Sequence, residues 1–161
     1  MAVNLISTDA VSDKIYIHTG ITSTVSSSFA TVDTRPRGIA YDGANLISCD
    51  QGLNKIFKHS GITGSISNSF ASPSSDPTGL TYDGANLISA NGLMGQTNRI
   101  YKHSGITSTI LTSFNAPIAG RVMVTYDGAD LISSNFTGDA VINKIFRHYG
   151  ITSFISVLAG P

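Results

Sequence analysis

The chain places one titratable residue type at equivalent positions four times. His18, His59, His103 and His148 each end a five-residue segment of the form basic, Ile, aromatic, any residue, His. A neutral imidazole is a common metal ligand, and a histidine changes charge near physiological pH, so four copies could build a metal centre or a pH switch. Both chemistries require the side chains to meet, which depends on the elements that carry them.

The remaining reactive residues do not form a recognisable catalytic motif. All ten acidic residues are aspartates, and Cys49 is the single cysteine, so no intrachain disulfide can form. We interpret Cys49 as a small residue in a strand or turn. Zinc spacing, a Gly-x-Ser-x-Gly elbow, a His-Glu-x-x-His pair and a phosphate loop are all absent from the sequence. The sequence therefore predicts no enzyme activity, no metal and no cofactor.

One segment is written three times in full. Tyr41–Ser48 returns almost unchanged at Tyr82–Ser89 and Tyr126–Ser133, and Asn4–Ser7 is a truncated first copy. A unit of just over forty residues defines a repeat architecture. We divide the single domain, 1–161, into repeats at approximately 1–34, 35–75, 76–119 and 120–161.

Each full copy reads as four short strands. In the second copy these are Gly38–Tyr41, Asn45–Ser48, Lys55–His59 and Ile62–Phe70, here named strands a, b, c and d. Asp42-Gly43 between the first two is a strong hairpin signal. Four strands with short connections form an antiparallel meander, and a period near forty is typical of a β-propeller blade. The predicted fold is all-β, with about four antiparallel blades.

The copies resemble the repeat of NHL and YVTN (YncE-like) propellers. The resemblance rests on Arg35-Pro36-Arg37-Gly38-Ile39-Ala40-Tyr41-Asp42-Gly43, Leu46-Ile47-Ser48 and Asn54-Lys55-Ile56-Phe57, and equally on Asp76–Asp83 with Asn98–Tyr101. It covers essentially the whole chain and implies architecture, because this fold hosts many activities. The last copy departs from the pattern, since Arg121-Val122-Met123-Val124 replaces Pro-x-Gly-apolar, so its first strand is expected to start differently.

The strand count predicts an open arc. The first copy starts at strand b, so its blade is expected to lack strand a, and three complete blades follow. An open arc exposes the apolar faces of its first and last blades. We expect two chains to associate head to tail as a homodimer that completes an eight-bladed ring. A four-bladed monomer and a fragment of a longer propeller are the alternatives.

The ring geometry gives the repeated polar residues structural roles. Equivalent histidines stand about a blade width apart, too far to share a metal with ligand bonds near 2 Å, so each is expected to hydrogen-bond the adjacent turn. Asp42, Asp83 and Asp127 are expected to cap turns in which glycine accepts a positive φ. The aromatic residues of strand c are expected to pack between blades; they are Tyr16, Phe57, Tyr101 and Phe146.

Variation is concentrated at one end of the blades. The b–c loops and d–a connectors share that face, and the b–c loops lengthen in the last two copies. Loops on a rigid scaffold commonly carry binding residues, so we predict a ligand face here, with neutral drift as the alternative. The candidate contacts are Asp9, Asp13, Asp50, Asn54, Asn91, Met94, Asn98, Asn135, Phe136, Asp139, Asn143, Arg35, Arg37 and Arg121.

Composition excludes some partners. The formal net charge is zero and 12% of residues are charged, so the chain has no electrostatic footprint for nucleic acid or an anionic membrane. Without a signal peptide or a long apolar run, we expect a soluble protein, cytoplasmic or associated with a virion.

These observations predict a non-enzymatic binding or scaffold module that associates with itself and takes a carbohydrate or protein ligand. One alternative is a structural subunit of a virion, tail or filament. Another is a metal-dependent propeller hydrolase or lyase, with a hard cation such as calcium held by Asp or Asn residues in the central channel.

Overall fold

The structure is a computed structural model that describes residues 4–92, 98–137 and 143–159. The described residues form fifteen strands and no helix. Blade 1 contains β1 (Ile6–Asp9), β2 (Lys14–His18) and β3 (Val25–Ala30). Blade 2 contains β4 (Pro36–Tyr41), β5 (Leu46–Asp50), β6 (Lys55–His59) and β7 (Ile66–Ala71). Blade 3 contains β8 (Pro77–Tyr82), β9 (Leu87–Asn91), β10 (Arg99–His103) and β11 (Ile110–Asn115). Blade 4 contains β12 (Arg121–Tyr126), β13 (Leu131–Phe136), β14 (Ile145–His148) and β15 (Ile155–Ala159).

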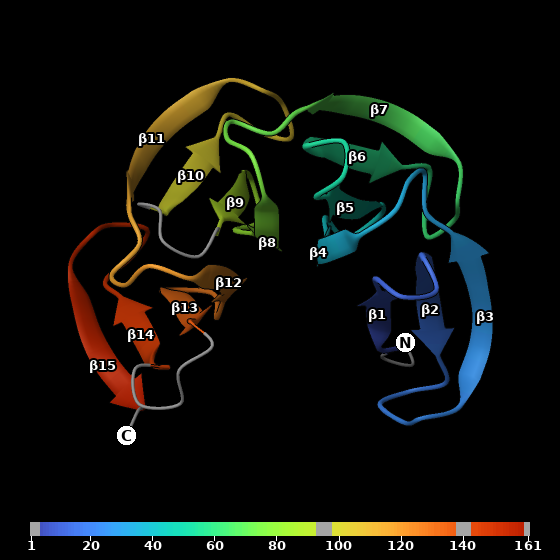
Figure 1. The fold of residues 1–161 in the computed structure, drawn as a ribbon, viewed down its shortest axis with the longest axis horizontal. Helices are drawn as coiled ribbons and strands as arrows, with labels where there is room; N and C mark the ends of the chain where they lie inside the picture. Colours follow the sequence, from blue (N-terminus) through green and yellow to red (C-terminus); the bar gives the residue numbers. More distant parts are fainter. Residues whose placement is uncertain (1–3, 93–97, 138–142, 160–161) are drawn as a thin grey trace.

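The blades are arranged as in a β-propeller. Each is an antiparallel sheet with its strands in chain order. Figure 1 shows the four blades around a common centre, with β1, β4, β8 and β12 innermost and β3, β7, β11 and β15 outermost. Blade 1 has three strands, as predicted, and the other blades have four. Blades 1 and 4 stand at the two ends of the arc (Figure 1).

The a–b turns are fixed by their aspartates, as predicted. Asp42 Oδ1 accepts the N–H groups of Ala44 and Asn45, and Gly43 has φ 97°. Burial alone would raise the pKa of Asp42, but the N–H groups of Asn45 and Ala44 and the ammonium of Lys58, 3.0 Å away, outweigh it and lower the pKa to about 2. The same turn recurs at Asp83 and Asp127.

Three of the histidines are buried and doubly bonded. His59 Nδ1 donates to the carbonyl of Thr63 at 2.7 Å, so its Nε2 accepts from the hydroxyl of Ser48 at 2.9 Å. His103 and His148 repeat both bonds. Burial lowers the pKa of all three. The predicted bond to the adjacent turn is confirmed for these three, and they are not brought together.

The core lies between blades rather than within them. Ile47 and Ile56 of blade 2 pack against Leu80 and Leu87 of blade 3, and an equivalent cluster joins blades 3 and 4. Phe57 and Phe146 are buried, as expected of the strand c aromatics. A phenylalanine on each of the outer strands β3, β7 and β11 also contacts the histidine of the following blade; the pairs are Phe29–His59, Phe70–His103 and Phe114–His148.

The only cysteine belongs to this core. Cys49 is buried and forms part of the cluster between blades 2 and 3. Burial raises the pKa of its thiol to about 12. The nucleophilic thiolate is therefore disfavoured at neutral pH, in agreement with a packing role.

Neighbouring inner strands approach each other closely at two glycines. A Cβ on Gly38 would lie 2.7 Å from the backbone nitrogen of Leu80, and one on Gly79 would lie 2.8 Å from the carbonyl oxygen of Val122. Met123 occupies the equivalent position in blade 4. No following blade of the described chain presses on it, so a large side chain fits there.

The predicted departure of the last copy is also confirmed. The register between β4 and β5 shifts after Pro36, and that between β8 and β9 shifts after Pro77. In blade 4, where Arg121 replaces the proline, pairing with β13 runs unbroken from Arg121 to Tyr126. Proline lacks the N–H needed for regular pairing, whereas arginine supplies it.

Candidate functional site

A pocket lies at the centre of the arc, on the end of the blades that carries the b–c loops. Its volume is about 290 Å³. The lining comes from all four blades, mainly from the innermost strands, with Ala10 just after β1 and Phe136 at the end of β13. The lining residues are Thr8, Ala10, Pro36, Arg37, Thr78, Arg121, Met123 and Phe136. The blades thus converge on one cavity at the face that the sequence predicts for ligand binding.

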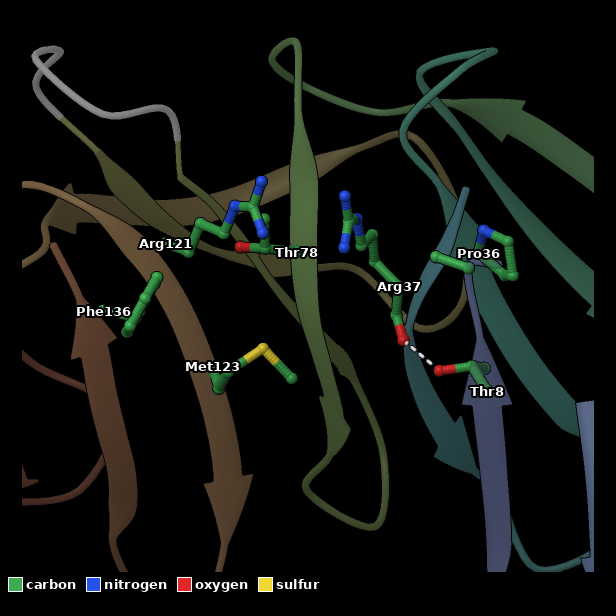
Figure 2. A pocket seen from close by; sticks show the side chains of 8 residues that line it. Thr8, Pro36, Arg37, Thr78, Arg121, Met123 and Phe136 are labelled. Carbon is green, nitrogen blue, oxygen red and sulfur yellow. Dashed lines mark hydrogen bonds between the residues drawn. The ribbon is translucent and has the colours of Figure 1, made fainter. Parts of the chain in front are cut away.

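Two arginines dominate the polar side of this pocket. Figure 2 shows the side chains of Arg37 and Arg121 on opposite sides of strand β8, near Thr78. Arg37 Nε donates to Gln51 Oε1 at 2.9 Å, and its carbonyl accepts from the hydroxyl of Thr8. Burial lowers the pKa of Arg37, and the positive charges of Arg121 and Arg35 lower it further.

Neither arginine forms an ion pair with a carboxylate of the described residues. Within the described ranges, the ion pairs are formed by Lys58, Lys102 and Arg147. The nearest acidic group in electrostatic terms is Asp76, which acts weakly on Arg37 and accepts a hydrogen bond from the Gln51 amide. The described residues that line the pocket therefore include two positive charges and no negative one, on a chain of zero net charge.

The other side of the pocket is apolar. Pro36 is buried, whereas Met123 and Phe136 present exposed side chains. Thr78 is buried at the floor between the arginines, and its hydroxyl donates to the carbonyl of Val122 at 2.7 Å. This arrangement offers a cationic rim above an apolar wall.

The candidate contacts predicted from sequence divide into pocket residues and loop residues. Arg37, Arg121 and Phe136 line the pocket. Asp9 instead caps its own loop by accepting the N–H of Val11 and the hydroxyl of Ser12, and these bonds lower its pKa.

Two candidates join the b–c loop of one blade to the connector that leaves the same blade. Asp13 Oδ1 accepts the N–H of Arg35 at 3.0 Å, and Asn54 Oδ1 accepts that of Asp76 at 2.9 Å. All four residues have φ between 53° and 68°, a left-handed conformation that Asn and Asp tolerate well. Both side chains therefore stabilise the conformation of the loop and of the connector that they join.

Three candidates, Asp50, Asn91 and Asn135, occupy equivalent positions at or next to the end of strands β5, β9 and β13. Asn91 Oδ1 accepts the N–H of Arg99, and its amide donates to Ser74. Asn135 Oδ1 accepts the N–H of Lys144. Asp50 is 3% exposed and accepts the N–H of Leu53, but its second oxygen has no hydrogen-bond partner among the described residues. Burial, and then the neighbouring charges of Asp33 and Asp13, raise the pKa of Asp50.

The remaining candidates lie around the long loops. Asn98 is buried and donates to the carbonyl of Gly120, and Asn143 Oδ1 accepts the N–H of Thr137 at 3.1 Å. Met94 and Asp139 fall outside the described residues.

Sequence reasoning missed five pocket residues. Thr8, Ala10, Pro36, Thr78 and Met123 line the cavity without having been proposed. Their positions along the strands could have identified most of them, because the first residues of strand a and the last residues of strand b meet at the centre of a propeller. Met123 carries a second signal, since it stands where the preceding copies have glycine.

The described residues contain no group of three or more His, Cys, Asp or Glu side chains placed to hold a metal ion. In the same part of the chain no helix is long and apolar enough to cross a membrane.

No protein-family model matches the sequence, and no curated protein matches it. The resemblance to NHL and YVTN repeats therefore stays a prediction. Solved structures do match in fold. The hydrazine synthase of Kuenenia stuttgartiensis matches with a TM-score of 0.68 and 16% identity, over 96% of this chain and 46% of that one. The glutaminyl cyclase of Myxococcus xanthus matches with a TM-score of 0.71 and 9% identity, over 91% and 61%.

A chain of the mitotic checkpoint complex matches with a TM-score of 0.64 and 13% identity, over 97% of this chain and 48% of that one. This chain thus spans between 46% and 61% of the length of these three structures. At such identities the likeness shows the fold alone. Together with the blade arrangement, it establishes that the chain has a β-propeller fold built from four blades.

Proposed function

We propose that the chain is a non-enzymatic binding module that associates head to tail with a second copy and presents its b–c loop face to a ligand. The observation that supports self-association is a difference in solvent exposure between equivalent residues, which are buried where another blade covers them and exposed at the end of the arc. Ile56 and Ile100 are 0% exposed, whereas the equivalent Ile145 in blade 4 is 40% exposed. The repeat builds the same apolar face each time, and blade 4 has no blade of the described chain to cover it.

Blade 1 shows the complementary contrast on its opposite side. Leu46 is 1% exposed where the preceding blade covers it, whereas the equivalent Leu5 is 41% exposed. Ile106 packs into the cluster between blades 2 and 3, whereas the equivalent Ile21 is 78% exposed. Blade 1 therefore presents the face that would follow blade 4 in the series.

The uncovered face of blade 4 is also hollowed. A depression of about 240 Å³ is lined by Met123, Val124, Thr125, Ile132, Ser134 and Ile145. Inside the chain, strand a of the next blade presses against Gly38 and Gly79. The described part of blade 1 has no strand at that position, so Met123 can fill the space when blade 1 of a second copy packs on blade 4.

The second copy is the preferred occupant because the chain already contains this interface three times. At each internal interface, the blade face that carries the residue equivalent to Ile56 packs against the face of the next blade that carries the residue equivalent to Leu46. Blade 4 leaves a face of the first kind uncovered, and blade 1 leaves a face of the second kind uncovered. Such a heterologous contact closes into a ring or continues into a filament, depending on the rotation between copies. Blades 1 and 4 line one central pocket here, so a closed eight-bladed ring requires the arc to widen.

Sedimentation velocity over a dilution series tests the self-association. Wild-type chain is expected to sediment as two copies, and Ile145→Asp to sediment as one, because a buried unpaired carboxylate is costly. Leu111→Asp is the matched control, since Leu111 is exposed on the outer strand of blade 3, whose faces are both covered. The control is expected to remain a dimer.

Three other outcomes would change this proposal. A wild-type mass of one chain at every concentration would overturn the self-association. A mass that keeps growing with concentration would replace the closed dimer by a structural filament subunit. Equal behaviour of the two variants would show that the contact lies elsewhere.

A further inference from the structure

We propose that the central pocket binds a small organic anion, with a carboxylate or phosphate held between Arg37 and Arg121 and a compact apolar body against Met123 and Phe136. This inference rests on the proposed function only in taking the b–c loop face as the ligand face. It does not depend on a second copy, because one chain supplies every named residue.

The first argument is the placement of charge. The two arginines reach the same cavity from blades 2 and 4, on either side of the inner strand of blade 3 (Figure 2). A guanidinium presents several N–H donors in a plane, and it matches the oxygens of a carboxylate or phosphate. Two such groups around one cavity provide donors from both sides of a bound anion.

The second argument is the lack of an ion pair at these arginines among the described residues. In blades 2, 3 and 4, by contrast, the strand c cation next to the histidine is paired: Lys58 with Asp42, Lys102 with Asp83, and Arg147 with Asp127 and Asp130. Arg37 instead faces the positive charge of Arg121 while half-buried. Like charges in a partly desolvated site destabilise each other, and an anion between them removes that cost.

The third argument is that Arg37 is held in place. Gln51 accepts from Arg37 Nε and donates its own amide to Asp76, so a chain of side-chain bonds orients the guanidinium. Nε is the inner nitrogen, and its bond to Gln51 leaves the two terminal nitrogens for the cavity. Pre-oriented donors lose less entropy on binding than mobile ones.

The fourth argument sets the size and polarity of the ligand. A cavity of about 290 Å³ is at the small end for organic ligands. Pro36, Met123 and Phe136 form its apolar side, which favours a ring or short branched chain over a sugar. A single-ring carboxylate or phosphate satisfies both requirements.

Nuclear magnetic resonance titration with benzoate and phenyl phosphate tests the proposal. Both anions are expected to shift the backbone amides of Arg37, Thr78, Arg121 and Met123 in a saturable manner, at concentrations up to about 10 mM. Benzamide is the neutral control of the same shape and is expected to bind roughly tenfold more weakly or not at all. Raising the salt concentration is expected to weaken the binding of both anions and to leave the binding of benzamide unchanged.

Two variants locate the binding. Arg121→Gln is expected to weaken both anions roughly tenfold or more, because it removes a charged donor. Arg99→Gln is the matched control, since Arg99 is an exposed arginine on β10 outside the pocket. Melting temperatures of both variants confirm that they are folded.

The proposal is overturned if neither anion gives saturable shifts at these amides, if benzamide binds as tightly, or if the two variants lose affinity equally. Sedimentation of the same samples separates the two proposals. Saturable anion binding by a monomeric chain supports the pocket and overturns self-association, and a dimer that binds no anion does the reverse.

Discussion

The interface between blades 2 and 3 and the outer face of blade 4 are built from the same repeat but differ in what covers them. At the interface, Ile56 is fully buried. The next inner strand lies so close to Gly38 that a Cβ atom there would be 2.7 Å from a backbone nitrogen of that strand. On blade 4, Ile145 is exposed and Met123 replaces the glycine. Blade 4 therefore differs from blade 2 at the position where a following inner strand requires glycine. It has the same residue, isoleucine, at the position that packs against a neighbouring blade.

The difference teaches that the end faces are not simply unused copies of the internal ones. Had blade 4 only lost its neighbour, glycine would still fit at position 123. A methionine there fills space and adds apolar surface, which suits a partner that lacks an inner strand. The uncovered face of blade 4 thus differs from the internal faces at the position where an inner strand would otherwise pack, as the proposed contact with blade 1 of a second copy requires.

The largest expected effect compares two equivalent isoleucines. Ile100→Ala is expected to lower the free energy of unfolding by about 2–5 kcal/mol, because it leaves a cavity in a closed interface. Ile145→Ala is expected to cost under about 1 kcal/mol in dilute, monomeric protein. Urea unfolding followed by circular dichroism measures both. Equal losses would mean that blade 4 is as well covered as blade 3, and would break the comparison.

The next effect tests the close approach of inner strands. Gly79→Ala is expected to cost about 2 kcal/mol, because its Cβ would meet the backbone of Val122 and Val124. Met123→Ala, at the equivalent position in blade 4, is expected to change stability by under about 1 kcal/mol. The same unfolding assay measures both. If Gly79→Ala proves neutral, inner-strand contact does not explain the glycines.

A smaller effect concerns the three buried histidines, each of which is packed against the preceding blade. Burial lowers the pKa of His59, His103 and His148, so the unfolded chain binds more protons than the folded one as pH falls below about 6.5, and stability is lost on acidification. The melting temperature is therefore expected to fall between pH 7 and pH 5. In His103→Gln the dependence is expected to shrink by about a third, since one of three such groups is removed.

Two results would contradict this prediction. One is a melting temperature that stays constant between pH 7 and pH 5. The other is a pH dependence in His103→Gln equal to that of the wild type, because burial of these histidines would then not be its cause.

The smallest effect is a stabilisation. Asp50→Asn gives blade 2 the residue that blades 3 and 4 already have at Asn91 and Asn135. Because the folded state raises the pKa of Asp50, its ionised form is destabilising at neutral pH, and the penalty disappears as pH falls toward the unfolded value near 4. The variant is expected to gain about 1 kcal/mol at pH 7 and little at pH 4. Thermal melts at both pH values measure the gain, and an equal gain at both would contradict a charge effect.

Much of the fold could be predicted from the sequence because the repeat fixes it locally. Asp-Gly turns, strand lengths and the three-stranded first blade follow from residues close together in the chain. The same holds for the bond between each buried histidine and the next turn. The different start of β12 followed from the loss of Pro-x-Gly at Arg121–Met123.

The pocket was harder to predict because it joins residues from four blades. Loop position favoured Asp13, Asn54 and Asn98, yet their side chains are bonded to connectors of the same chain. Thr78 and Pro36 looked like ordinary strand residues and became pocket residues only through the curvature of the arc. Curvature depends on blade packing, which strand patterns do not specify.

The measurement that tests the central claim most directly is solvent access to isoleucine methyl groups in wild-type protein. A soluble paramagnetic probe broadens the resonances of exposed methyl groups, and Ile56 and Ile100 serve as internal buried references. At high protein concentration, Ile145 and Ile21 are expected to be as protected as these references, and to become exposed on dilution or in Ile145→Asp. Broadening of Ile145 and Ile21 at every concentration would contradict the account, because the two uncovered faces would then have no partner in a second copy.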